Sequence, residues 1–126
     1  VVAPQVPNYV DKEDYRVFRF NSSKLPKREP YRAGLPSLDL NYQLKMRDVD
    51  FDLVHSHAPF GAGVEAILYA RKKKIPAVAT FHSKYQDDFR QVMGNETLVQ
   101  MGTKYIVWYF NKADYVWTVN RASGFR

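Results

Sequence analysis

The sequence contains no cysteine, which excludes disulfide bonds and thiolate metal ligands and fits a reducing compartment. It has no apolar run near the roughly 18 residues that a transmembrane helix needs, and no signal peptide is visible. Internal repeats and low-complexity tracts are also missing. Because 126 residues suffice for one domain with a real core, we expect a single globular domain in the cytoplasm.

Acidic side chains are outnumbered by basic ones, with 13 Asp and Glu against 19 Lys and Arg, which gives a net charge of +6. A positive surface attracts anions such as phosphates and acidic lipid headgroups. The same charge can also be plain solvated surface, because basic loops are common on soluble enzymes. We expect a phosphate or lipid partner rather than nucleic acid.

Short apolar runs alternate with segments of helical character. The expected strands are 1–3, 15–20, 51–56, 77–81 and 114–119, and the expected helices are 37–47, 61–74 and 97–112. This alternation predicts an α/β fold with a doubly wound, mostly parallel sheet and flanking helices. The run 51–56 is apolar on both faces at its middle, which is typical of a central parallel strand.

The expected helices have recognisable ends. Ser37 would cap the first helix. Its apolar side chains are Leu38, Leu40, Leu44 and Met46. The second helix ends in four cations, 71–74, which complement the negative end of a helix dipole without any ligand. The third helix is apolar almost all round, so we expect it to be buried between elements rather than to lie on a membrane. Residues 83–96 are expected to be a looser connection.

Residues 21–36 form a proline-containing, basic segment that cannot be regular for long. Four cations surround Tyr31, and Arg32 is one of them. A long basic loop inside a compact domain is either functional or mobile. Two interpretations stay open here: a contact to a phosphate or acceptor, and a solvated loop.

All three histidines stand where predicted strands end. His55 and His57 are two residues apart, so they share a face if the strand continues that far. His82 ends the strand expected beside it. The carboxyl ends of parallel strands line the functional crevice of open α/β sheets. We therefore expect the three imidazoles to lie within reach of one another.

The surroundings of the three histidines differ. His55 is nearest the apolar run and is interpreted as a hydrogen-bonded residue beneath a loop. His57 and His82 are followed by small, polar or turn-forming residues, which places them at the mouth of a cleft. There an imidazole can bind a hydroxyl or act as acid or base near neutral pH. Helix N-termini in both loops would add N–H donors for an anion.

Three imidazoles can also bind zinc with one open position, as in metal hydrolases, and Asp87 and Asp88 could add oxygen ligands. The sequence shows neither a ligand spacing on a helix nor a second metal motif. We therefore expect no metal and no bound cofactor, and keep the zinc hydrolase as a minor alternative.

Two stretches resemble the N-terminal domain of the retaining glycosyltransferases of family 4, which have the two-domain GT-B fold. They read FDLVHSHAPFGAGVEAILYARKKKIPAVATFHSKYQDDF and KADYVWTVNRAS, and together they span about residues 51–123. Members of that family pair a strand ending in His-x-His with a helix, and then a strand ending in Thr-Phe-His or Thr-Tyr-His. Within the family, the chain is most similar to enzymes that glucosylate diacylglycerol and to related lipid mannosyltransferases.

This resemblance implies a Rossmann-like half of a GT-B fold and a set of site residues. His82 matches the cleft histidine near the transferred sugar and the acceptor, which is the catalytic position. The positions implied for acceptor or sugar binding are Tyr31, Arg32, His57, Phe60, Gly61 and Ser83. Tyr31 and Arg32 resemble the loop that meets a lipid-linked acceptor. The donor is then a substrate, a nucleotide sugar, and no cofactor is implied.

Two parts of the family pattern have no counterpart in the sequence. One is the first strand with its Gly-rich phosphate loop, and the other is the C-terminal domain that holds the nucleotide diphosphate. We therefore expect residues 1–126 to be a single, incomplete, acceptor-side domain excised from a longer protein. Such a piece should not catalyse transfer by itself.

The favoured hypothesis is a hexosyltransferase that uses a nucleotide sugar, UDP-glucose being the first candidate, and a hydroxyl acceptor such as diacylglycerol. The parent protein would be cytoplasmic and could bind the inner face of the plasma membrane. The alternative is a non-catalytic α/β binding module for anionic lipid or a phosphorylated ligand. Likeness of fold alone does not distinguish the transferase from the binding module, because unrelated functions share doubly wound sheets.

Overall fold

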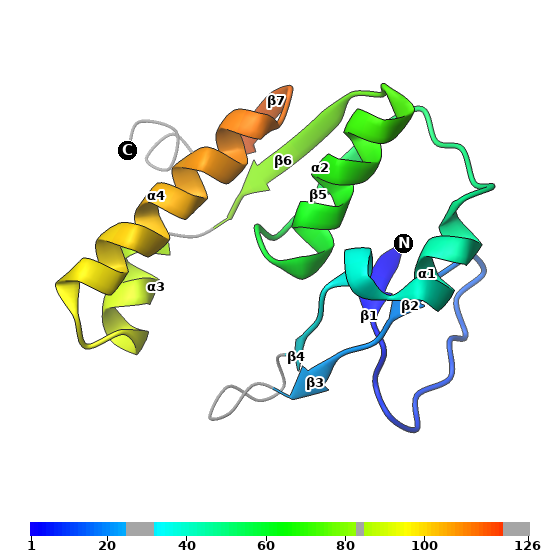
Figure 1. Cartoon of the computed structure of the whole chain (residues 1–126), viewed down its shortest axis with the longest axis horizontal. Coiled ribbons are helices and arrows are strands. Elements are labelled where there is room, and N and C mark those ends of the chain that lie inside the picture. Colours follow the sequence, from blue (N-terminus) through cyan, green and yellow to red (C-terminus); the bar gives the residue numbers. More distant parts are fainter. Residues whose placement is uncertain (25–31, 83–84, 120–126) are drawn as a thin grey trace.

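The computed structural model describes residues 1–24, 32–82 and 85–119 (Figure 1). Its strands are β1 (Val2–Pro4), β2 (Phe18–Phe20), β3 (Ser23–Lys24), β4 (Arg32–Ala33), β5 (Val54–Ser56), β6 (Ala77–Phe81) and β7 (Tyr115–Thr118). Its helices are the 3₁₀ turn η1 (Pro36–Leu38), α1 (Leu40–Met46), α2 (Gly61–Lys73), α3 (Tyr85–Val92) and α4 (Glu96–Lys112).

The strands form two parallel sheets and one small hairpin. β5, β6 and β7 lie side by side in that order, all parallel, and β1 pairs with β2, also in parallel. β3 and β4 form an antiparallel hairpin that projects from the body of the molecule (Figure 1). The predicted α/β class, with a parallel sheet and flanking helices, is confirmed.

Helices α2 and α4 cover the same face of the three-stranded sheet (Figure 1). Ala77 and Ala79 project from one side of β6 and pack against side chains of both helices. Side chains at alternate positions of a strand point to opposite faces, so Thr80 lies on the other side. On that other face Trp117 of β7 is 58% exposed.

A second apolar cluster joins the N-terminal strands to the helices. It contains Phe18 and Phe20 of β2, Tyr42 and Met46 of α1, and Tyr69 of α2. Val54 of β5 packs against both this cluster and the one beneath α2 and α4. The apolar core therefore runs from β2 to β6, although the two sheets are not hydrogen-bonded to each other among the described residues.

The first predicted helix begins later than expected. Residues 36–38 form the 3₁₀ turn η1, and α1 is capped by Asp39, whose carboxylate accepts the N–H of Tyr42. The prediction of Ser37 as the cap is therefore wrong. The prediction of which side chains of this helix face the core was also largely wrong. Leu38, Leu40 and Leu44 are exposed, whereas Tyr42 and Met46 are buried.

Other boundaries differ from the sequence-based expectations. The strand predicted over 51–56 begins only at Val54, because its partner β6 begins at Ala77 after Pro76. Phe51 and Leu53 precede the strand and are exposed. The expectation that both faces of this strand are covered is therefore wrong at these two residues. The strand expected over 15–20 is likewise confined to residues 18–20. Within 83–96 the structure contains α3, which the sequence analysis missed.

Helix α4 is not buried on all sides, so that expectation is wrong. Its buried residues are Val99, Ile106 and Tyr109, and Tyr109 packs in one cluster with Ala77 and Ala79 of the sheet. Met101 and Trp108 are exposed, by 62% and 48%. The sheet covers one side of the helix and α3 packs against another part of it, where Phe89 lies against Gly102, and among the described residues Met101 and Trp108 stay exposed. None of the helices in this part of the chain is long and apolar enough to cross a membrane.

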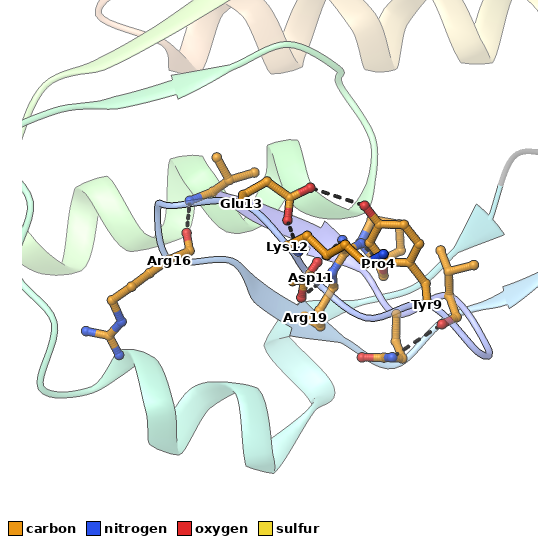
Figure 2. A network of polar contacts seen from close by, with 10 residues as sticks. Pro4, Tyr9, Asp11, Lys12, Glu13, Arg16 and Arg19 are labelled. Carbon is orange, nitrogen blue, oxygen red and sulfur yellow. Dashed lines mark hydrogen bonds and ion pairs between the residues drawn. The ribbon is translucent and has the colours of Figure 1, made fainter.

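The loop between β1 and β2 is held by polar contacts rather than by a helix (Figure 2). The Arg19 guanidinium donates to the carbonyl of Pro4 at 2.8 Å and pairs with Asp11 at 2.5 Å. Further along the loop, the Tyr9 hydroxyl donates to Glu13 at 3.1 Å. These contacts fold the loop back onto β2 (Figure 2).

Asp39 links α1 to β2, and this link should be pH-dependent. The N–H groups of Asn21 and then Tyr42 hold the pKa of the Asp39 carboxyl below its ordinary value. A lowered pKa stabilises the fold at neutral pH, and this contribution is lost as the pH falls through that lowered value. We expect Asp39→Ala to lower the melting temperature at neutral pH, with a difference from wild type that shrinks in acid. The exposed Asp48→Ala serves as a control, and equal melting curves for both variants would contradict this role.

Candidate active site

The pairing of β5 with β6 brings the three histidines together. Val54 lies opposite Ala77 and Ser56 opposite Ala79, so both strands end at the same edge of the sheet. His55 and His57 stack with their ring centroids 4.1 Å apart, as expected for residues two apart on one face. The His57 and His82 rings are 5.5 Å apart. The predicted convergence of the imidazoles is confirmed.

The three imidazoles form a row, and His55 lies at its inner end. Its Nε2 is 2.6 Å from the hydroxyl oxygen of Thr80, and its ring meets the edge of Trp117 at 5.1 Å between centroids. Burial, reinforced by the charges of His57 and His82, lowers the pKa of His55. The interpretation of His55 as a hydrogen-bonded residue beneath a loop is confirmed as to the hydrogen bond, whose partner Thr80 belongs to the neighbouring strand.

His57 and His82 form the exposed end of the row. Nδ1 of His57 lies 3.2 Å from Nε2 of His82, and both residues are solvent-exposed. In a hydrogen bond between two imidazoles one nitrogen donates and the other accepts, so at least one of the two rings is neutral. An exposed, paired imidazole at a strand end can accept from a sugar hydroxyl or exchange a proton with it.

Two tyrosines of α4 hold the loop that carries His57. The Tyr109 hydroxyl hydrogen-bonds the Ser56 hydroxyl, and the Tyr105 hydroxyl donates to the carbonyl of Pro59. Ser56 also donates to the carbonyl of Ala58 at 3.0 Å. The backbone on both sides of His57 is thus tied to α4, which fixes the direction in which the imidazole points.

Two glycines of α2 allow this loop to pack closely. A Cβ on Gly63 would lie 1.9 Å from the carbonyl oxygen of Ala58, and one on Gly61 would lie 2.0 Å from that of Gly34. Any side chain at either position would displace the backbone. Gly61 therefore has a packing role here, and Phe60, which precedes α2, is half exposed beside it.

The structure describes only some of the other predicted site residues. Arg32 donates to the hydroxyl of Ser22 at 2.7 Å and to its carbonyl at 2.9 Å, so its guanidinium holds the β3–β4 hairpin together. Tyr31 and Ser83 lie outside the described residues. Asp87 and Asp88, considered as metal ligands, are in the first turn of α3. Among the described residues, no three His, Asp or Glu side chains are arranged to hold a metal ion.

Several residues around the histidines were not predicted from the sequence. Thr80 could have been found, because it precedes His82 by two residues and so shares its face. Tyr105 and Tyr109 are four residues apart on one side of a helix, but this spacing also fits ordinary core packing. The Phe81, Tyr85 and Phe110 rings, with centroids 5.2 to 6.1 Å apart, form an aromatic group that joins β6, α3 and α4.

A hollow of about 160 Å³ lies between α1 and α2, away from the histidines. Glu65 lines it, and burial raises the pKa of this carboxyl, which accepts from the Gln43 amide at 3.3 Å. Met46, Leu68 and Tyr69 supply apolar walls. We interpret it as a gap in helix packing rather than as a binding site.

The Tyr109 hydroxyl should contribute measurably to stability. The residue is 1% exposed, and Tyr109→Phe removes its bonds to the Ser56 hydroxyl and to the Ala58 carbonyl, while Ser56 keeps its own bond to Ala58. We expect the free energy of unfolding to fall by about 1 kcal/mol, measured by urea denaturation. The exposed Tyr115→Phe is the matched control and should change it by less than about 0.5 kcal/mol. An unchanged midpoint for Tyr109→Phe would show that the hydroxyl does not hold the loop.

His55 should make the fold sensitive to acid. Because its pKa is lowered in the folded chain, the unfolded chain takes up this proton first. Stability should therefore decline as the pH drops below about 6.5, the ordinary value for histidine, and level off once the lowered pKa is passed. In His55→Asn we expect a smaller decline, measured as the urea midpoint at about pH 7.5 and about pH 5.5. An identical decline in the variant would rule out His55 as the source.

Comparison with known proteins agrees with this geometry. Residues 1–124 match the profile of Glycosyltransferase Family 4. The alpha-monoglucosyldiacylglycerol synthase of Acholeplasma laidlawii is 33% identical over 76 residues, which cover 60% of this chain and 19% of that protein. The enzyme of the same name from Streptococcus pneumoniae strain ATCC BAA-255 / R6 is 26% identical over 99 residues, 75% of this chain and 21% of that protein.

The chain spans about a fifth of the length of the curated relatives it matches. No solved structure matches it significantly. The family match covers nearly the whole chain and includes both strands that end in the paired histidines. The chain belongs to glycosyltransferase family 4.

Proposed function

We propose that this chain is the acceptor-side part of a hexosyltransferase. The reaction would move a hexose from a nucleotide sugar, UDP-glucose being the first candidate, to a hydroxyl acceptor such as diacylglycerol. The proposal is supported by membership of family 4 and by the names of the two relatives, both alpha-monoglucosyldiacylglycerol synthases. The observation that carries it is the exposed pair His57 and His82 at the carboxyl ends of two adjacent parallel strands.

In this proposal His82 contacts the hexose and the acceptor, and His57 holds His82 in place. The bond between the sugar C1 and the phosphate oxygen breaks and C1 bonds to the acceptor oxygen. The proton of the acceptor hydroxyl passes to the leaving phosphate oxygen, and the nucleoside diphosphate is released. A neutral imidazole can orient these hydroxyls through hydrogen bonds. The negative charge that develops on the leaving phosphate needs positive groups or N–H donors, which the remainder of the protein would supply.

The remaining residues have supporting roles. We assign Ser83 and Phe60 to the acceptor side of the cleft, and Gly61 to the close packing that places Phe60. Arg32 would hold the base of the hairpin that precedes the site, which agrees with its bonds to Ser22. Tyr31, next to it in the sequence, would contact the lipid part of the acceptor.

We also propose that this chain is one incomplete half of a two-domain enzyme. Within the described residues β1 pairs only with β2 and β5 only with β6, and α2 contacts both β1 and β5. One further parallel strand between β1 and β5 would complete a continuous sheet beneath α2. The proposed first strand, with a Gly-rich phosphate loop, fits this place, and a separate domain would bind the nucleotide. The chain alone is then expected to be inactive.

The reaction class can be tested with the complete protein. It would be incubated with UDP-glucose and vesicles that contain diacylglycerol, and the lipids would be analysed by mass spectrometry. A glucosylated lipid supports the proposal. UDP release without a lipid product would keep the transferase and reject the lipid acceptor. Neither product, across several nucleotide sugars, would favour the non-catalytic binding module instead.

His82 should be essential for transfer. In the complete protein we expect His82→Ala to lower kcat by at least about 100-fold, because reacting groups would lose their orientation. His82→Asn retains one hydrogen-bonding group and should be impaired less. The control is Lys12→Ala, in the exposed loop between β1 and β2, which should keep the wild-type kcat. Near-normal transfer by His82→Ala would remove His82 from the site.

A further inference from the structure

The exposed pair formed by His57 and His82 has a spacing close to that of a metal chelate. Nδ1 of His57 lies 3.2 Å from Nε2 of His82, and both residues are solvent-exposed. An imidazole nitrogen that carries no proton is a ligand for transition metals. Two nitrogens bound at about 2.0–2.1 Å to one tetrahedral ion lie about 3.3 Å apart. The two strand ends therefore already hold the nitrogens at the separation that such an ion requires.

His55 does not belong to this chelate. Its Nε2 is engaged with the Thr80 hydroxyl at 2.6 Å, and its ring stacks on that of His57 with the planes 29° apart. The lone pairs of an imidazole lie in the plane of its ring, so those of two stacked rings do not meet at one ion. This explains why, among the described residues, no three His, Asp or Glu side chains are arranged to hold a metal ion. The pair offers two ligands rather than the three of a catalytic zinc centre.

The backbone that carries the two imidazoles is held in place before any ion binds. The register of β5 and β6 ends both strands at one edge, and the Tyr105 hydroxyl fixes the loop after His57 through the carbonyl of Pro59. Only the rings have to move. Their nitrogens now face each other in a hydrogen bond, with the ring centroids 5.5 Å apart. Each ring must turn by roughly 35° for both lone pairs to meet at a tetrahedral ion, which exposed side chains allow.

We propose that His57 and His82 together bind a divalent transition-metal ion, with water in its remaining coordination positions. Imidazole nitrogen suits Zn²⁺, Cu²⁺ and Ni²⁺, whereas Mg²⁺ and Ca²⁺ prefer oxygen ligands. The ion replaces the hydrogen bond between the rings. The proton of that bond moves to the other nitrogen of its ring, so both imidazoles stay neutral and each donates one lone pair. An ion with only two protein ligands exchanges with solution, and it is not the catalytic zinc of a hydrolase.

A metal at this place would inhibit sugar transfer reversibly. This consequence rests on the proposed function, in which the His82 imidazole contacts the hexose and the acceptor. The ion would occupy Nε2 of His82 and turn the ring, so the imidazole could no longer orient a hydroxyl. Removal of the ion would restore the hydrogen-bonded pair. Metal binding itself requires neither donor nor acceptor.

Metal titration of the complete protein tests the site. Binding of Zn²⁺, Cu²⁺ and Mg²⁺ would be measured by isothermal titration calorimetry in the wild type and in His57→Asn and His82→Asn. His55→Asn is the matched control, because it makes the same change at the histidine outside the chelate. Circular dichroism would confirm that all three variants fold. Electron paramagnetic resonance of bound Cu²⁺ in the wild type would report nitrogen ligands directly, without any substitution.

We expect the wild type to bind Zn²⁺ and Cu²⁺ but not Mg²⁺. Loss of either imidazole of the pair should weaken zinc binding by at least about tenfold, and His55→Asn by less than about threefold. The Cu²⁺ spectrum should show coupling to nitrogen that His57→Asn and His82→Asn reduce. Absence of zinc binding in the wild type, unchanged binding in His57→Asn or His82→Asn, or an equal loss in His55→Asn would each overturn the assignment. A Cu²⁺ spectrum without nitrogen coupling would overturn it as well.

Inhibition is tested separately, in the glycolipid assay of the complete protein. Saturating Zn²⁺ should abolish transfer, and a chelator should restore it. Zinc binding to the pair without inhibition would keep the metal site and contradict the contact between His82 and the hexose. Because the binding measurements use no sugar donor, they can fail while lipid glucosylation succeeds, or succeed while glucosylation fails.

Discussion

The parallel pairing of β5 with β6 is the constraint on which the site depends. It sets Val54 opposite Ala77, and this register brings both strands to an end at one edge of the sheet. His57 and His82 meet there, 3.2 Å apart, only because the two strands end together. A shift of the register by one residue would turn one histidine to the opposite face of the sheet. The buried residues of β6 make such a shift costly, because Ala77 and Ala79 pack beneath both helices.

Helix α4 connects the core, the site and the outer surface. Its inner side packs Tyr109 against the sheet, and the hydroxyl of the same residue holds Ser56 below the histidines. One turn earlier, Tyr105 bonds the loop beyond His57 and stacks on the exposed Trp108. Anything that shifts α4 should therefore also shift His57.

Much of this arrangement could be predicted from the sequence. Apolar runs and helical periods identified the main elements, and the spacing of His55 and His57 predicted their shared face. Boundaries were less predictable, because β5 begins only where a hydrogen-bonding partner begins. Helix α3 was missed because most of its side chains are polar, and its contacts through Tyr85 to Phe81 and Phe110 and through Phe89 to Gly102 depend on how it docks. The bonds from α4 to the histidine loop could not be predicted, since they depend on how the helix docks.

A crystal structure of the complete protein with a bound nucleotide sugar would test the proposed site most directly. We expect the hexose to lie at the carboxyl ends of β5 and β6, with one of its hydroxyls in hydrogen-bonding contact with the His82 imidazole. We also expect one additional parallel strand between β1 and β5. A sugar bound away from the histidines would contradict the proposed site, and a different segment between those strands would contradict the proposed architecture.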